Sequence, residues 1–161
     1  MWKLRGPEPM IHTEFDSRVP YDGTSAMFDF VTSKKIPNGD LRVTLLRNPL
    51  QIQRGRDKFD WTVKIEMIGG GLLPENDLYP NWAPDSGYQS TFEVRERATD
   101  VPWAQDMSQN FYFKNSRDQY GRLFIGLSTD SMRPDTGISI QAWINPSGSQ
   151  NLEFDPTKQI R

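Results

Sequence analysis

Strict alternation of apolar and polar side chains runs through residues 59–67, which read Phe59-Asp60-Trp61-Thr62-Val63-Lys64-Ile65-Glu66-Met67. Five apolar residues occupy one register and four polar residues occupy the other. Successive side chains of a strand point to opposite sides of a sheet, so a period of two is the pattern of a strand that buries one face. The stretch therefore predicts a half-buried β-strand and favours an all-β fold.

Shorter stretches on both sides of it repeat this pattern and are separated by turn residues. Strands are expected at 25–33, 41–46, 50–54, 90–97, 111–113, 123–127 and 138–145. Twelve Pro and 12 Gly interrupt the chain, which leaves room for at most one short helix, expected within 101–110 after Asp100. About eight or nine short strands with regular turns are typical of an antiparallel β-sandwich or a jelly roll.

The first 24 residues differ from the rest of the chain. Three prolines and a turn signal at 21–24 predict an extended N-terminal arm over residues 1–24, which either covers a sheet edge or acts as a linker. We expect residues 25–161 to form a single β-sandwich domain, because 161 residues is about the size of one domain.

Charge and composition exclude several classes of function. Nineteen Lys and Arg against 21 Asp and Glu give a net charge of −2, which argues against nucleic-acid binding. No apolar stretch approaches the roughly 20 residues of a membrane span, so no membrane insertion is expected. Cysteine is absent, which excludes disulfides and thiolate chemistry. A cytosolic and a secreted protein are both compatible with this composition, and a secreted or cell-surface location is favoured.

Catalytic motifs are hard to find in the sequence. His12 is the single histidine, and no nucleophile elbow or phosphate-binding loop accompanies it. A pair of glycosidase carboxylates stays open, because the required spacing is spatial. Calcium could be held by acidic groups at 16 and 22, at 75, 77 and 85, or at 130 and 135, although solvated turns, where Asp is intrinsically favoured, are the preferred explanation. The sequence thus favours a protein without catalytic activity and without a cofactor.

Trp143 is the first candidate for a binding residue. It lies in the opposite register from the isoleucines of its strand, between Gln141 and Asn145. An indole flanked by amides offers a flat apolar surface for a sugar ring and hydrogen-bonding groups for its hydroxyls. The alternative is that the C-terminal tail or a loop covers this tryptophan, since tryptophan is usually buried.

The long irregular segment 72–89 contains the second candidate. Tyr79, Trp82 and Tyr88 lie there among polar residues, and two prolines stiffen the segment. Long loops of this kind are often functional. The alternative is an Ω-loop whose aromatic residues pack it onto the sandwich.

An all-β scaffold with aromatic residues on a polar face and in a long loop resembles, in general style, the non-catalytic carbohydrate-binding modules. The resemblance implies a glycan ligand bound by Trp143, Gln141, Asn145, Tyr79, Trp82 and Tyr88. A structural or protein-interaction domain of a larger assembly is the alternative. A glycan-active hydrolase or lyase is a third hypothesis, which needs two carboxylates, or a tyrosine with a basic partner, in a groove.

Overall fold

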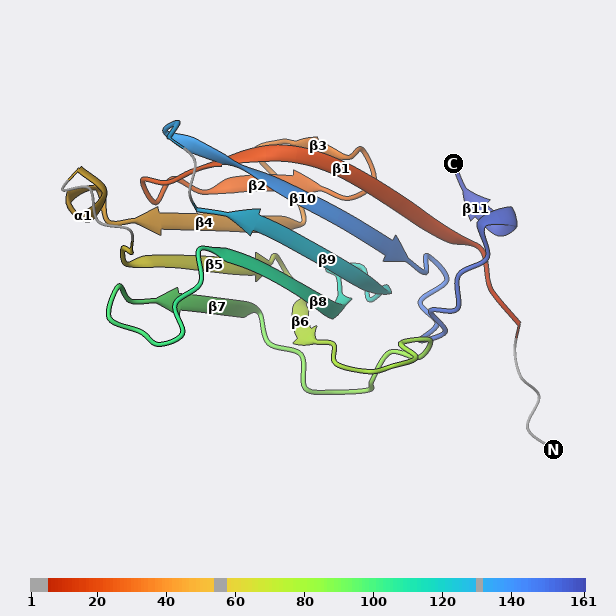
Figure 1. Cartoon of the computed structure of the whole chain (residues 1–161). Coiled ribbons are helices and arrows are strands. Elements are labelled where there is room, and N and C mark those ends of the chain that lie inside the picture. The colour runs from red at the N-terminus through yellow and green to blue at the C-terminus, as the bar shows by residue number, and fades with distance from the viewer. Residues whose placement is uncertain (1–5, 54–57, 130–131) are drawn as a thin grey trace.

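The computed structural model describes residues 6–53, 58–129 and 132–161 and shows two β-sheets packed face to face (Figure 1). The six-stranded sheet has the order β11 (Gln159–Ile160), β1 (Met10–Pro20), β10 (Asp135–Ile144), β9 (Tyr120–Ser128), β8 (Asp106–Lys114) and β6 (Gly71–Pro74). The five-stranded sheet has the order β3 (Lys34–Lys35), β2 (Ala26–Asp29), β4 (Leu41–Arg47), β5 (Trp61–Met67) and β7 (Thr91–Glu96). Neighbouring strands are antiparallel except for β1 and β11. The expected all-β sandwich is confirmed, while a jelly-roll connectivity stays a prediction.

The hydrophobic core lies between the two sheets, as the alternation of residues 59–67 requires. In β5 the four residues of the apolar register are at most 2% exposed: Trp61, Val63, Ile65 and Met67. Facing residues of β9 and β10 belong to the same core cluster, including Leu123, Ile125, Ile138 and Ile140. Burial of each such side chain contributes about 1.5–3 kcal/mol, which makes this interface the main source of stability.

Part of the expected N-terminal arm is a strand of the sandwich. Residues Ile11 to Pro20 of β1 pair with β10 along their whole length, from Ile11 opposite Ile144 to Pro20 opposite Asp135. Only three of the inward positions of β1 are large and apolar, Ile11, Phe15 and Val19, and polar residues separate them. The alternation is therefore weak in the sequence, and pairing with the apolar strand β10 overrides it.

Among the described residues, the single α-helix lies in a different place from the one expected. It spans α1 (Pro49–Gln53), where a strand was expected, and a 3₁₀ turn η1 (Pro156–Lys158) lies near the C-terminus. Asn48 Oδ1 accepts a hydrogen bond from the Leu50 amide at 3.0 Å, and proline follows it, which is a helix start that the sequence interpretation missed. Residues 101–105 are not helical, and β8 begins at Asp106 because the residues after it alternate like a strand. The last residue of the strand expected at 50–54 lies outside the described residues.

None of the helices in the described part of the chain has the length and apolar character that crossing a membrane requires.

Candidate functional site

The outer face of the six-stranded sheet carries several of the residues predicted to bind a ligand, and it has two halves. Strand pairing places the following side chains in one row across it: His12, Trp143, Arg122 and Tyr112. We call these residues and Met10 the covered half. The rows further along the same strands form the open half: Glu14, Gln141, Phe124, Asn110, Asp16, Ser139, Gly126, Ser108, Gly137, Ser128 and Asp106.

The long loop and the C-terminal segment lie over the covered half. Ala83 of the loop and Leu152 of the tail are buried in one cluster with Met10 and Tyr112. The two covering segments also bind each other, because the Leu152 amide donates to the Asn81 carbonyl at 2.8 Å. This part of the sheet is therefore a second, smaller core.

Two polar contacts join the start of the loop to the sheet. Arg122 Nε donates to Glu75 Oε2 at 3.3 Å, and the Tyr112 hydroxyl donates to Asp77 Oδ2 at 2.6 Å. Burial raises the pKa of Glu75, and the charge of Arg122 opposes the shift. Burial, together with the hydrogen bond to Asp77, raises the pKa of Tyr112 as well. These groups satisfy one another and fix the loop in place.

Trp143 lies within the covered half. Its ring stacks on His12 with 4.8 Å between centroids and 11° between planes, and the Arg122 guanidinium lies 5.3 Å from its centre. His12 and Arg122 are its cross-strand neighbours on β1 and β9. The indole is half-buried and already packed against protein groups, so a role in binding stays a prediction.

The two amides predicted beside Trp143 differ in their surroundings. Asn145 is fully buried, and its Nδ2 donates to Glu8 Oε2 at 2.7 Å and to the Asn151 carbonyl at 2.8 Å. Its Oδ1 accepts from the amide and the hydroxyl of Ser147. Because both the nitrogen and the oxygen of its side chain are already hydrogen-bonded, a structural role is favoured for Asn145. Gln141, by contrast, lies in the open half and donates to Glu14 Oε1 at 3.1 Å.

The three aromatic residues of the loop do not form one platform. Tyr79 is 84% exposed and Trp82 is 55% exposed. Tyr88 is half-buried, packs on Tyr120 at 6.0 Å between ring centres and donates its hydroxyl to the Pro84 carbonyl. Burial raises the pKa of Tyr88. Tyr88 thus fits the Ω-loop alternative, and binding by Tyr79 and Trp82 stays a prediction.

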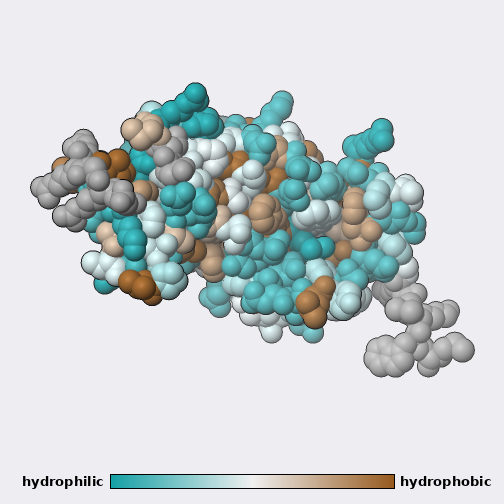
Figure 2. All heavy atoms as spheres, viewed as in Figure 1, coloured by the Kyte–Doolittle hydropathy of each residue, from teal (hydrophilic) through white to brown (hydrophobic). Residues whose placement is uncertain are grey.

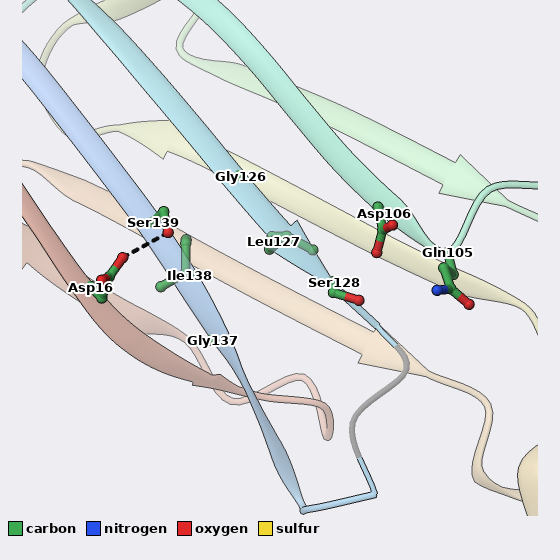
Figure 3. A pocket seen from close by; sticks show the side chains of 9 residues that line it. All are labelled: Asp16, Gln105, Asp106, Gly126, Leu127, Ser128, Gly137, Ile138 and Ser139. Carbon is green, nitrogen blue, oxygen red and sulfur yellow. Dashed lines mark hydrogen bonds between the residues drawn. The ribbon is translucent and has the colours of Figure 1, made fainter.

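A shallow hollow of about 630 Å³ lies in the open half (Figure 3). Its floor includes Gly126 and Gly137, which have no side chains to fill it. Asp16 lies on one side, where its Oδ1 accepts from the Ser139 hydroxyl at 2.7 Å, and Asp106 lies on the other side. Figure 2, drawn from the viewpoint of Figure 1, shows pale and brown surface along the middle of the molecule between hydrophilic regions.

Phe124 lies beside this hollow and was missed by the sequence interpretation. A methyl group at position 126 would lie 3.3 Å from Phe124 Cζ and 3.4 Å from its Cε1, so the ring lies over Gly126. Gln141 and Asn110 are the cross-strand neighbours of Phe124. An apolar ring between two amides is the arrangement that the sequence suggested for Trp143. The alternation of Leu123 and Ile125 would have identified Phe124, because it places this residue on the outer face.

The open half has an acidic character. Glu14, Asp16 and Asp106 are exposed on it. Two cations lie next to it in the strand register, and both are paired: Arg18 lies 2.7 Å from Asp135, and Arg122 lies 3.3 Å from Glu75. An anionic ligand would therefore be repelled from this surface.

The described residues contain no group of three or more His, Asp or Glu side chains placed to hold a metal ion. Of the acidic groups considered for calcium, Asp130 lies outside the described part of the chain. Asp22 instead accepts from the Thr24 amide at 2.9 Å, as expected of an aspartate in a turn.

Comparisons with known protein families, with curated proteins and with solved structures found no match to this chain. The chemistry of the outer face is therefore the basis for assigning a function.

Proposed function

We propose that the protein is a non-catalytic module that binds a neutral glycan along the open half of the six-stranded sheet. The observation on which this rests is the position of Phe124, whose ring lies over Gly126 between Gln141 and Asn110. The C–H face of a sugar packs on such a ring, and amides bind its hydroxyl groups. Gly126 permits this geometry, because a larger residue would displace the ring.

The hollow next to Phe124 gives room for further sugar units. Two glycines leave its floor without side chains, and its volume of about 630 Å³ falls within the roughly 300–1,000 Å³ usual for ligand sites. Asp16 and Asp106 offer hydrogen-bond acceptors at its two sides. The acidic character of the surface favours uncharged glycans over sulfated or uronic ones.

The exposure of Asp16 and Asp106 favours a glycan-binding function over glycan hydrolysis. A glycosidase shields one carboxylic acid of its pair from solvent so that it can donate a proton. Asp16 and Asp106 are both exposed.

A glycan array that contains neutral and acidic polysaccharides tests the proposal. We expect the wild-type protein to bind neutral glycans and Phe124→Ala to lose at least about fivefold in affinity, since stacking on an aromatic ring is worth about 1 kcal/mol or more. Leu46→Ala is the matched control, because Leu46 is 54% exposed on the outer side of the other sheet. An array without hits on folded protein, or equal binding by Phe124→Ala, would contradict the proposal.

A protein-interaction role is the second candidate and rests on a different surface. Exposed Leu46 and Leu50 lie near an apolar depression that includes Tyr21, Ile52 and Pro134. Light scattering distinguishes the two functions, because a stable oligomer that the Leu46→Asp change dissociates would favour assembly over glycan binding.

A further inference from the structure

A second cavity, of about 430 Å³, opens at the end of the sandwich where β1 begins and β10 ends. One wall is the turn between β8 and β9, residues 115–119, from the six-stranded sheet. The opposite wall comes from the turns that flank β3 in the five-stranded sheet. The cavity lies between the two sheets, away from the open half, and its size suits a small molecule.

Opposite charges face each other across this cavity without an ion pair. Asp29 and Asp40 line one wall, and Arg117 lines the other. Within the described part of the chain, the guanidinium of Arg117 has no hydrogen bond and no carboxylate within 4.0 Å. The separation leaves space for a molecule that carries both charges.

The pKa of Asp40 depends on the charges of the other two groups. Burial raises the pKa of Asp40, the charge of Asp29 raises it further, and the charge of Arg117 lowers it. A cation bound between the two aspartates would relieve the repulsion between them.

The walls are held in place before any ligand binds. Asp29 Oδ1 accepts from the amides of Val31 and Thr32 at 2.7 and 3.3 Å, which fixes the carboxylate. Asn115 Oδ1 accepts from the amides of Arg117 and Gln119, both at 3.0 Å, which fixes the turn. A pre-organised site loses less entropy on binding.

Apolar side chains complete the lining. Ile11 and Ile144, which are paired across β1 and β10, form part of the wall together with Pro146. They offer a surface for a small aliphatic group beside the charged residues.

We propose that this cavity binds a small zwitterion of the α-amino acid class. Asp29 and Asp40 bind its ammonium group, Arg117 binds its carboxylate, and Ile11, Ile144 and Pro146 contact its aliphatic side chain. The site is independent of glycan binding, since it uses a different surface.

Titration of the ¹⁵N-labelled protein with L-valine, followed by NMR, tests this site. We expect shifts in the amides of residues 29–32, 38–40 and 115–119. Isovalerate lacks the ammonium group and isobutylammonium lacks the carboxylate. Each should bind at least about tenfold more weakly, because one charged hydrogen-bond partner is left without its counterpart. Absence of shifts with valine, or equal affinity for the three compounds, would overturn the proposal.

Variants provide the second part of the test. Arg117→Gln changes an exposed side chain and should leave the fold intact while weakening valine binding at least about tenfold. Asp40→Asn should have a similar effect. Asp118→Asn is the matched control, because Asp118 lies next to Arg117 in sequence but pairs with Lys114 at 3.3 Å. Unchanged affinity in Arg117→Gln, or a loss of affinity as large in Asp118→Asn, would overturn the assignment.

Discussion

The covered and the open half of the outer face are built on the same four strands, yet only one of them acquires a lid. In the covered half, Trp143, Arg122 and Tyr112 lie side by side across three strands. Covering large, partly apolar side chains with further apolar groups stabilises the fold. The loop supplies Ala83 and the tail supplies Leu152 for this purpose. In the open half, Gly126 and Gly137 offer little side-chain surface to cover. The covered half thus combines three large side chains with a lid, whereas the glycines of the open half leave the hollow beside Phe124.

The largest expected difference between the halves is in stability. We expect Trp143→Ala to lower the free energy of unfolding by about 2–3 kcal/mol, because it removes the stacking on His12 and leaves a cavity. Phe124→Ala should cost less, about 1 kcal/mol, since its half-buried ring lies over Gly126 and is not covered by the loop and the tail. Urea unfolding monitored by circular dichroism measures both values. Equal losses would mean that the two halves do not differ in burial.

A smaller difference in stability is expected between variants of Asn145, which is buried, and of Asn110, which lies on the open half. Asn145→Ala should cost about 2 kcal/mol, since it leaves the buried carbonyl of Asn151 without its donor. Asn110→Ala, on the open half, should change stability by about 0.5 kcal/mol or less. The same unfolding experiment serves here, and a neutral effect of Asn145→Ala would show that its hydrogen bonds are replaced by water.

The smallest expected effect is a pH dependence that arises in the covered half. The side chain of Glu75 is 7% exposed, and burial raises its pKa in the folded state above that of the unfolded chain. Its contribution to stability is therefore present below the ordinary pKa of glutamate and is lost as the pH rises through the folded-state pKa. Glu75→Gln should be at least as stable as the wild type at neutral pH, and this difference should shrink as the pH falls.

Thermal unfolding at several pH values between neutral and acidic measures this difference. A Glu75→Gln variant that is less stable than the wild type at neutral pH would contradict the account. In that case the ion pair with Arg122 would outweigh the cost of burial.

The sequence predicts the sandwich well because its core strands alternate clearly. Residues 61–67 illustrate this, since each apolar side chain of the pattern is buried as expected. Strand β1 was missed because polar residues separate its inward apolar positions, and only pairing with β10 makes it a strand. Helix α1 was missed although Asn48 and Pro49 form a local start signal.

The candidate site was less accessible to sequence reasoning. The prediction that Trp143 points away from the core was correct. The segments that cover this half of the sheet, however, are held together by contacts between residues 81–83 and 150–152, which are far apart in the chain. The hydrogen bonds that saturate Asn145 come from Glu8 and Asn151 and are likewise invisible in a local pattern. Phe124, by contrast, could have been found, since alternation alone places it on the open face.

NMR mapping with a neutral hexasaccharide taken from the glycan array would show which surface of the protein binds the glycan. We expect shifts in the amides of residues 108–110, 124–128 and 137–141, with the indole signal of Trp82 unchanged. Shifts of Trp82 and of the loop around Tyr79, with the open half unaffected, would contradict it and place the ligand on the loop.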